Sequence, residues 1–215
     1  MNEIREMKET TSRSDMWEKR RKQLNGSNAL RFALILILFY MVQDLVNDIR
    51  TESSAFEIRF ENDTLLESAG TFYRLYVNDE EYGDIDYNQY FRTDSNGNTD
   101  YKYCRLIDDA SRLTYTLILA AMMFIVTLIA DSAINSTPFT KKNIDRVKMI
   151  AGLQLCLGIF PGTVRLIMSF IRFNYYSTSF NESTLFFIAI AIVIAMIAVV
   201  FEKGLALQED VDSIA

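Results

Sequence analysis

Three polar side chains interrupt stretches of the chain that are otherwise apolar. Asp44 lies near the end of the first apolar block, whereas Gln154 and Arg165 lie within the third. An ionisable group inside a bilayer is costly and often marks a functional site. Counting from Lys148 at the usual helical rise puts Arg165 about 25 Å along its helix, near the far interface, where its side chain can reach water. We expect Asp44 and Arg165 to act as interfacial anchors, and we hypothesise that they pair between the first and third helices.

Gln154 lies deeper, about one third of the way across a bilayer from the same count. The simplest interpretation is a hydrogen bond between helices within the bundle. The alternative is a solute pathway, which would need several such groups facing one another. The fourth apolar block offers no polar side chain for that purpose.

The residue sets that usually carry catalysis or metal binding are missing from the sequence. The chain has no histidine, no phosphate-binding glycine loop and no nucleophile or metalloprotease motif. The stretch from Asp94 to Asp100 resembles the start of a calcium loop, but Thr99 and Arg105 stand where such a loop needs Gly and Glu. A solvated turn is the favoured interpretation. We therefore expect a protein that is not an enzyme, without catalytic, cofactor-binding or metal-binding residues.

The two cysteines do not change this expectation. Cys104 falls in a polar segment and Cys156 inside an apolar block, so they should lie at different depths. A disulfide between them is not expected, and their spacing does not match a zinc site.

Four apolar blocks determine the expected fold. A run of about 20 mostly apolar residues is long enough to cross a bilayer as a helix. The sequence predicts an all-α membrane protein with four transmembrane helices and a small β-rich extracytoplasmic segment between helices 1 and 2. The expected order is a cytoplasmic basic arm 1–27, helix 28–46, extracytoplasmic segment 47–111, helix 112–130, cytoplasmic loop 131–146, helix 147–171, extracytoplasmic turn 172–184, helix 185–203 and cytoplasmic tail 204–215.

Alternating apolar and polar residues predict strands in the segment 47–111. One run contains Phe56, Ile58 and Phe60, and a second contains Tyr73, Leu75 and Val77. The dipeptide Asn96-Gly97 is typical of a type I′ hairpin turn. Such a hairpin would pair Arg92 with Tyr101 and Tyr90 with Tyr103.

The distribution of Lys and Arg predicts the orientation. Eight lie before Phe32, four lie between Asp131 and Lys148, and Arg172 is the one in the third loop. Because short cytoplasmic loops are enriched in Lys and Arg, we expect both termini and the middle loop in the cytoplasm. The basic run from Lys19 to Lys22 fits this topology rule, and the alternative is a docking site for anionic lipid or an acidic partner.

Two motifs lie on the predicted cytoplasmic side. The loop runs Pro138-Phe-Thr-Lys-Lys-Asn143, where Thr140 can cap the third helix and Asn143 falls at the position of a capping-box partner. The last element contains Phe201, Gly204 and Leu207-Gln208 at helical spacing, which would extend the fourth helix.

Together these motifs resemble a bacterial family of four-helix membrane proteins catalogued as domain of unknown function 2975. The family is similar in its Pro-Phe-[Thr/Ser]-x-x-Asn loop, its Phe-x-x-Gly-x-x-Leu-Gln-x-[Glu/Asp]-x-Asp element, its large segment between helices 1 and 2 and its total length. The resemblance implies a bacterial cell-membrane protein with no established activity. In this family the gene often lies beside one for a small helix-turn-helix DNA-binding protein.

The resemblance suggests a non-enzymatic interaction or regulatory protein that partners a small helix-turn-helix regulator and does not itself contact nucleic acid. The residues that we assign to such contact are Phe139, Thr140, Asn143, Arg146, Gly204, Gln208 and Asp212. A second interpretation is that both motifs only cap helices and pack against each other. The competing function is a small transporter or channel subunit, assembled as a homo-oligomer in the bilayer, which Gln154, Pro161-Gly162 and Arg165 would serve.

Overall fold

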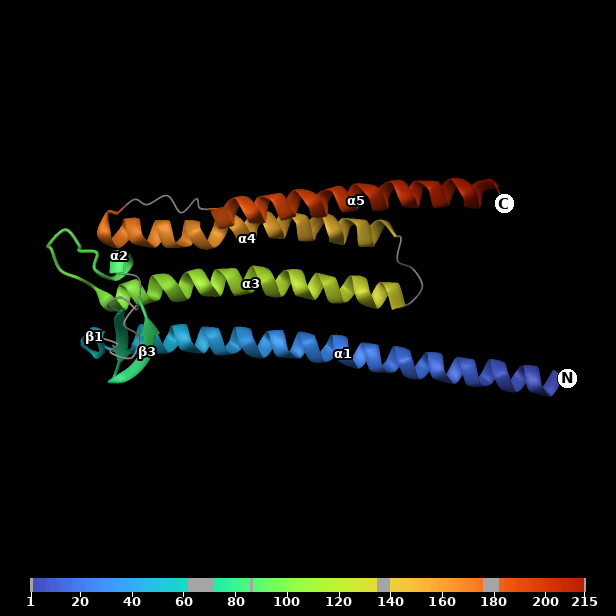
Figure 1. The fold of residues 1–215 in the computed structure, drawn as a ribbon, viewed down its shortest axis with the longest axis horizontal. Helices are drawn as coiled ribbons and strands as arrows, with labels where there is room; N and C mark the ends of the chain where they lie inside the picture. Colours follow the sequence, from blue (N-terminus) through green and yellow to red (C-terminus); the bar gives the residue numbers. More distant parts are fainter. Residues whose placement is uncertain (1, 62–71, 86, 135–139, 176–181, 215) are drawn as a thin grey trace, which may run out of the picture. The chain divides into compact units, whose positions relative to one another are not determined.

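The computed structural model describes residues 2–61, 72–85, 87–134, 140–175 and 182–214. Its described elements are the helices α1 (Asn2–Arg50), α2 (Tyr87–Tyr90), α3 (Tyr101–Ile134), α4 (Lys141–Phe173) and α5 (Glu182–Ile214), a short 3-10 turn at Ser53–Ala55, and the strands β1 (Phe56–Glu61), β2 (Phe72–Val77) and β3 (Glu80–Asp84) (Figure 1).

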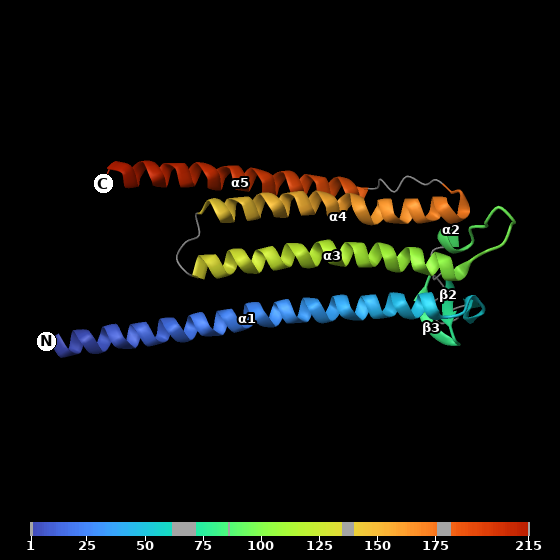
Figure 2. The same ribbon diagram turned by 180° about the vertical axis from the view of Figure 1, so that it is seen from behind.

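The chain divides into two compact units, which we name by their contents. The terminal unit comprises Met1–Leu38, Ile118–Cys156 and Phe186–Ala215. The sheet unit comprises Phe39–Leu117 and Leu157–Leu185. Within the terminal unit the first residues of α1 and the last residues of α5 lie at the same end (Figures 1 and 2).

Four helices are long enough and apolar enough to cross a membrane. The qualifying segments are Gly26–Arg50, Tyr101–Ala133, Lys141–Phe173 and Ser183–Leu207. Each contains one of the four predicted blocks, so the mostly helical fold with four long apolar helices is confirmed. By length and composition the chain is compatible with a multi-pass membrane protein.

The helices extend further than the apolar blocks alone indicate. Helix α1 covers the basic arm as well, because Glu, Lys and Arg favour helix in polar surroundings. Helix α3 starts eleven residues before the predicted position because Asp100 caps it: the Tyr103 N–H donates to Asp100 Oδ1 at 3.0 Å. Thr140 caps α4 as expected, with the Asn143 N–H donating to its hydroxyl at 3.3 Å.

The expected β-rich segment is a three-stranded antiparallel sheet in the order β1-β2-β3. The two alternating runs form β1 and β2, with Ile58 opposite Leu75, and this prediction is confirmed. Figure 1 shows the strands beside the last turns of α1 and the first turns of α3, all within the sheet unit. The apolar core of this unit joins sheet and helices through Leu75, Tyr90, Cys104, Ile107 and Phe173.

The predicted hairpin at Asn96-Gly97 is wrong. Tyr90 ends the short helix α2 and Tyr101 begins α3, so neither takes part in a strand pair. What is left is a single bridge between Thr93 and Thr99. The reason is local: the Asp94 carboxylate accepts the N–H groups of Asn96 and Asn98, and this closes a compact turn without flanking strands.

A two-residue hairpin turn does occur, at Asn78-Asp79 between β2 and β3. Both residues have positive φ, 52° and 66°, as a type I′ turn requires. Val77 and Glu80 pair on either side of it. Asn and Asp tolerate this left-handed conformation better than other non-glycine residues, which explains their place here.

We predict that Asn78→Val lowers the stability of the protein by about 1–2 kcal/mol, because a β-branched residue is strained at positive φ. Asn78→Gly should leave stability unchanged or raise it. The measurement is thermal unfolding of the purified full-length chain in lipid nanodiscs. Asn96→Val is the matched control, because Asn96 is outside the positive-φ region. Equal losses for Asn78→Val and Asn96→Val would contradict this account of the turn.

Candidate functional site

Arg105 is the centre of the most deeply buried group of charges that the structure describes. Its side chain is 3% exposed. The guanidinium donates to Asp48 Oδ2 at 3.0 Å and forms ion pairs with Asp109 Oδ1 at 2.9 Å and with Asp44 Oδ2 at 3.6 Å. Asp44 and Asp48 are one turn apart on α1, as are Arg105 and Asp109 on α3. The ion pairs therefore join the last turns of α1 to the first turns of α3.

Tyr82 of β3 closes the same group from the side of the sheet. Its ring centroid lies 3.5 Å from the Arg105 guanidinium carbon, which is a cation–π contact. Its hydroxyl donates to Asp44 at 2.7 Å. One arginine therefore contacts two helices and one strand, and we call Arg105, Asp44, Asp48, Asp109 and Tyr82 the arginine cluster.

Lys102 strengthens the same junction one turn earlier on α3. Its ammonium group donates to the carbonyls of Ile49 and Thr51 at 2.8 and 2.6 Å. The carbonyls at the C-terminus of a helix have no partner within the helix and carry partial negative charge. Lys102 therefore caps α1 from α3.

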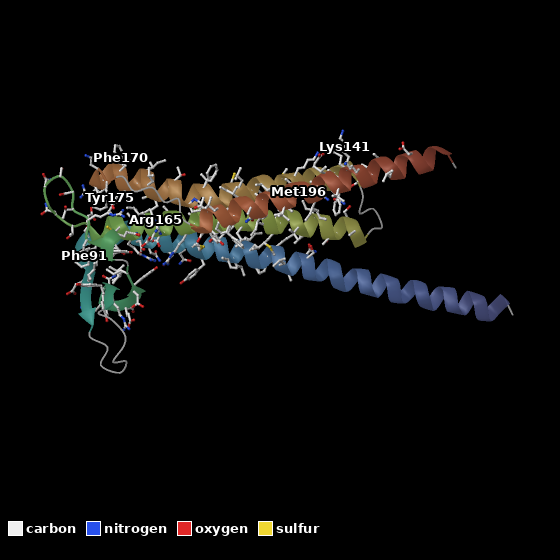
Figure 3. All side chains as sticks on the ribbon, turned by 45° about the horizontal axis from the view of Figure 1, so that its top comes forward. Phe91, Lys141, Arg165, Phe170, Tyr175 and Met196 are labelled. Carbon is white, nitrogen blue, oxygen red and sulfur yellow. The ribbon has the colours of Figure 1, made fainter. Side chains whose placement is uncertain are left out.

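Asp108, which precedes Asp109 on α3, is the centre of a second group of polar and charged side chains. It accepts from Arg165 on α4 at 3.0 Å and from Gln89 at 2.7 Å through Oδ1, and from the Tyr90 hydroxyl at 2.9 Å through Oδ2. Figure 3 shows Arg165 on α4. Burial and the adjacent Asp108 carboxylate raise the pKa of Tyr90, so this phenol remains a hydrogen-bond donor. The group attaches α2 and α4 to α3.

The structure gives Asp44 and Arg165 different partners from those that the sequence suggested. Asp44 lies beside Arg105 and Tyr82, whereas Arg165 binds Asp108. Both residues do lie in helices of the sheet unit, but they belong to separate clusters. The cause is that α3 begins at Tyr101 and not at residue 112, which puts Arg105 and Asp108 on its first turns as charged partners.

A third contact joins the end of α4 to the turn before α3. Arg172 lies 2.9 Å from Asp100 and 3.9 Å from Asp94. The backbone N–H groups of Asn98 and Asn96, together with Arg172, hold the pKa of Asp94 below its usual range. The carboxylates of the stretch that resembled a calcium loop therefore contact backbone donors and a guanidinium.

In the terminal unit the loop motif is directed inwards. Asn143 is 2% exposed; its amide donates to Ser132 of α3 at 2.9 Å and its oxygen accepts from Arg146 at 2.8 Å. Arg146 also donates to the carbonyl of Leu128 at 2.9 Å. These contacts fasten the start of α4 to the end of α3, which favours the capping and packing interpretation for Asn143 and Arg146.

The other residues assigned to partner contact are less constrained by the structure. Thr140 is half-buried at the cap and Gly204 is exposed on α5, with open space where a side chain would be. Phe139 lies outside the described residues, as do the side chains of Gln208 and Asp212.

Exposed charges next to the motif were not selected from the sequence. Lys141, Lys142 and Asp145 lie on the outer side of the first turns of α4, and Figure 3 marks Lys141. The exposed residues and the buried Asn143 lie on different faces of the first turns of α4. The cap at Thr140 fixes where the helix begins and therefore which residue lies on which face.

Arg31 makes a further, partly buried contact in the terminal unit. Its guanidinium donates to the Thr127 hydroxyl at 2.9 Å and pairs with Asp131, both on α3, and it also lies over the Phe124 ring. Gln154 is buried within this unit, and its hydrogen bond to a neighbouring helix stays a prediction. Each unit therefore has its own charged connection between α1 and α3.

No family model, curated protein or solved structure matches this chain. The resemblance to domain of unknown function 2975 therefore stays a prediction that depends on the loop and tail motifs. Within the described residues there is no group of three or more acidic or cysteine side chains placed to hold a metal ion. The chemistry that the geometry offers is electrostatic: it fixes helix ends to one another and to the sheet.

We predict that Arg105→Gln destabilises the protein far more than Arg165→Gln. Removing the guanidinium leaves buried carboxylates without a counter-charge, which costs about 3–5 kcal/mol. Arg165 is 42% exposed, and a partly solvated pair contributes about 1 kcal/mol or less. Thermal unfolding at pH 7 and the amount of protein in the membrane are the measurements. Similar losses for the two variants would contradict the different burial of the two clusters.

Proposed function

We propose that this chain is a non-enzymatic, multi-pass protein of a bacterial cell membrane that acts by binding a protein partner on the cytoplasmic side through its terminal unit. The observation that carries the proposal is the exposed charge at the start of α4, which belongs to the same unit as both termini. Lys141 and Lys142 are exposed at the start of α4, and α5 continues as a helix to Ile214, past its apolar segment.

The orientation is supported by charge. The basic arm of α1 and the start of α4 both belong to the terminal unit, and both carry the Lys and Arg residues expected on the cytoplasmic side. In the proposed topology the segment 47–111 is extracytoplasmic. It crosses despite its own basic residues, since long loops translocate largely regardless of charge.

The proposed partner is a small helix-turn-helix regulator, in line with the family resemblance. An acidic surface on such a protein would suit Lys141 and Lys142. Gly204, Gln208 and Asp212 on α5 belong to the same unit, and Gly204 offers close approach for a partner backbone. The role first assigned to Asn143 passes to these exposed lysines, because Asn143 is occupied within the chain.

The transporter or channel alternative has less support. It requires polar groups that face a shared pathway or a symmetry axis. Gln154 is buried within a single chain, and Arg165 is bound to Asp108. Gln154 is therefore not exposed to a pathway between chains, and Arg165 already has a counter-charge.

The test is crosslinking in the native cell, followed by affinity purification and mass spectrometry. We expect the full-length chain to recover a small DNA-binding protein. The double substitution Lys141→Gln with Lys142→Gln should reduce that recovery at least tenfold, because it removes the exposed positive charges.

The matched control is Glu52→Gln with Glu80→Gln, which neutralises two exposed charges in the sheet unit. It should leave the recovery unchanged. If both double variants recover the partner equally, the contact surface is wrong. If the chain is recovered only as a defined homo-oligomer, the result favours the transporter and leads to flux assays.

A further inference from the structure

The arginine cluster contains more negative than positive charge. Asp44 is 34% exposed and can be hydrated, but Asp48 and Asp109 are 6% and 7% exposed. These two buried carboxylates share a single guanidinium, that of Arg105. Two ionised carboxylates and one arginine leave one excess negative charge inside the sheet unit, and a low-dielectric interior makes that charge costly.

One oxygen of this cluster has no donor. Asp109 Oδ1 forms an ion pair with Arg105, but Asp109 Oδ2 is buried and makes no hydrogen bond to the residues that the structure describes. Asp48 Oδ2 and Asp109 Oδ1 contact two nitrogens of the same guanidinium, Nε at 3.0 Å and Nη2 at 2.9 Å, so the two carboxylates lie side by side. Two carboxylates that face each other repel when both are ionised, whereas a proton between them forms a strong hydrogen bond.

The other charged and titratable groups around Asp109 are already engaged. On β3 the Tyr82 hydroxyl donates to Asp44, and on α4 Arg165 binds Asp108. On α3 Lys102 caps the carbonyls at the end of α1. Arg105 supplies its donors to Asp48 and Asp109 together.

We propose that Asp48 and Asp109 hold one proton between them at neutral pH, with Asp109 Oδ2 donating to the Asp48 carboxylate. The ligand of this site is therefore the proton. Binding it removes one unit of negative charge from the cluster and converts the unpaired oxygen into a donor. The site belongs to the sheet unit and is independent of the proposed partner binding.

The site links the strength of the α1–α3 junction to pH. An unfolded Asp is ionised above about pH 4, so between there and the loss of the shared proton the folded chain binds one proton more than the unfolded chain. Stability from this site is therefore present at low pH and is lost as the pH rises. Loss of the proton restores repulsion between α1 and α3 at the arginine cluster.

The first experiment is infrared spectroscopy of the full-length protein in nanodiscs. We expect the stretching band of a protonated carboxyl group at pH 7, which disappears as the pH is raised. Asp109→Asn and Asp48→Asn should each remove it. Asp84→Asn, at an exposed carboxylate paired with Arg74, should leave it in place. The absence of the band in the wild type, or its persistence in both cluster variants, would overturn the proposal.

The second experiment compares thermal unfolding between pH 5 and pH 9. The wild type and Asp84→Asn should show a falling midpoint as the pH rises, whereas Asp109→Asn should show a clearly smaller decline and the higher midpoint at pH 9. Parallel declines in all three proteins would overturn the proposal. If Asp109→Asn does not fold, the wild-type infrared titration and the Asp48→Asn variant still decide.

Discussion

A guanidinium that is almost fully buried must be surrounded by acceptors, because an unpaired charge in the interior costs several kcal/mol. In this protein that requirement falls on Arg105. Its acceptors come from the last turns of α1 and from its own helix, and its aromatic neighbour comes from β3. The end of α1, the start of α3 and the third strand are therefore positioned by the need to neutralise one side chain. Lys102, about one turn before Arg105 on α3, contacts the carbonyls at the end of α1. Asp108, about one turn after Arg105, contacts α2 and α4.

Apolar length and strand alternation were sufficient to predict the main elements. The four apolar blocks lie in four long helices, and the runs around Ile58 and Leu75 form paired strands. Such patterns are local and repeat along the chain, so a single sequence reveals them. The hairpin prediction was wrong because Asn96-Gly97 suits several kinds of turn. Which kind forms depends on Asp94 and on the helix that Asp100 caps.

The charge clusters were missed for a related reason. Arg105, Asp108 and Asp109 have helical spacing, but their segment was assigned to the polar region before the helix. The sequence does contain a sign that the helix begins earlier: Asp100 can cap it, and Arg105 and Asp109 follow at a spacing of one helical turn. The choice between Arg105 and Arg165 as the partner of Asp44 could not be made from sequence, since it depends on how the helices are rotated about their axes. The same limit applied to Asn143, which is buried, and Lys141, which is exposed, because the rotation of α4 decides which of them faces the protein.

If Arg105 holds α1 and β3 against α3, its loss should loosen both elements, and hydrogen exchange measured by mass spectrometry would show this. The comparison is between wild type and Arg105→Gln, both full length in nanodiscs at pH 7. We expect faster exchange in Phe39–Arg50 of α1 and in Glu80–Asp84 of β3, with the N-terminal turns of α3 also affected. Faster exchange confined to the turns of α3 around residue 105, with α1 and β3 unchanged, would contradict it.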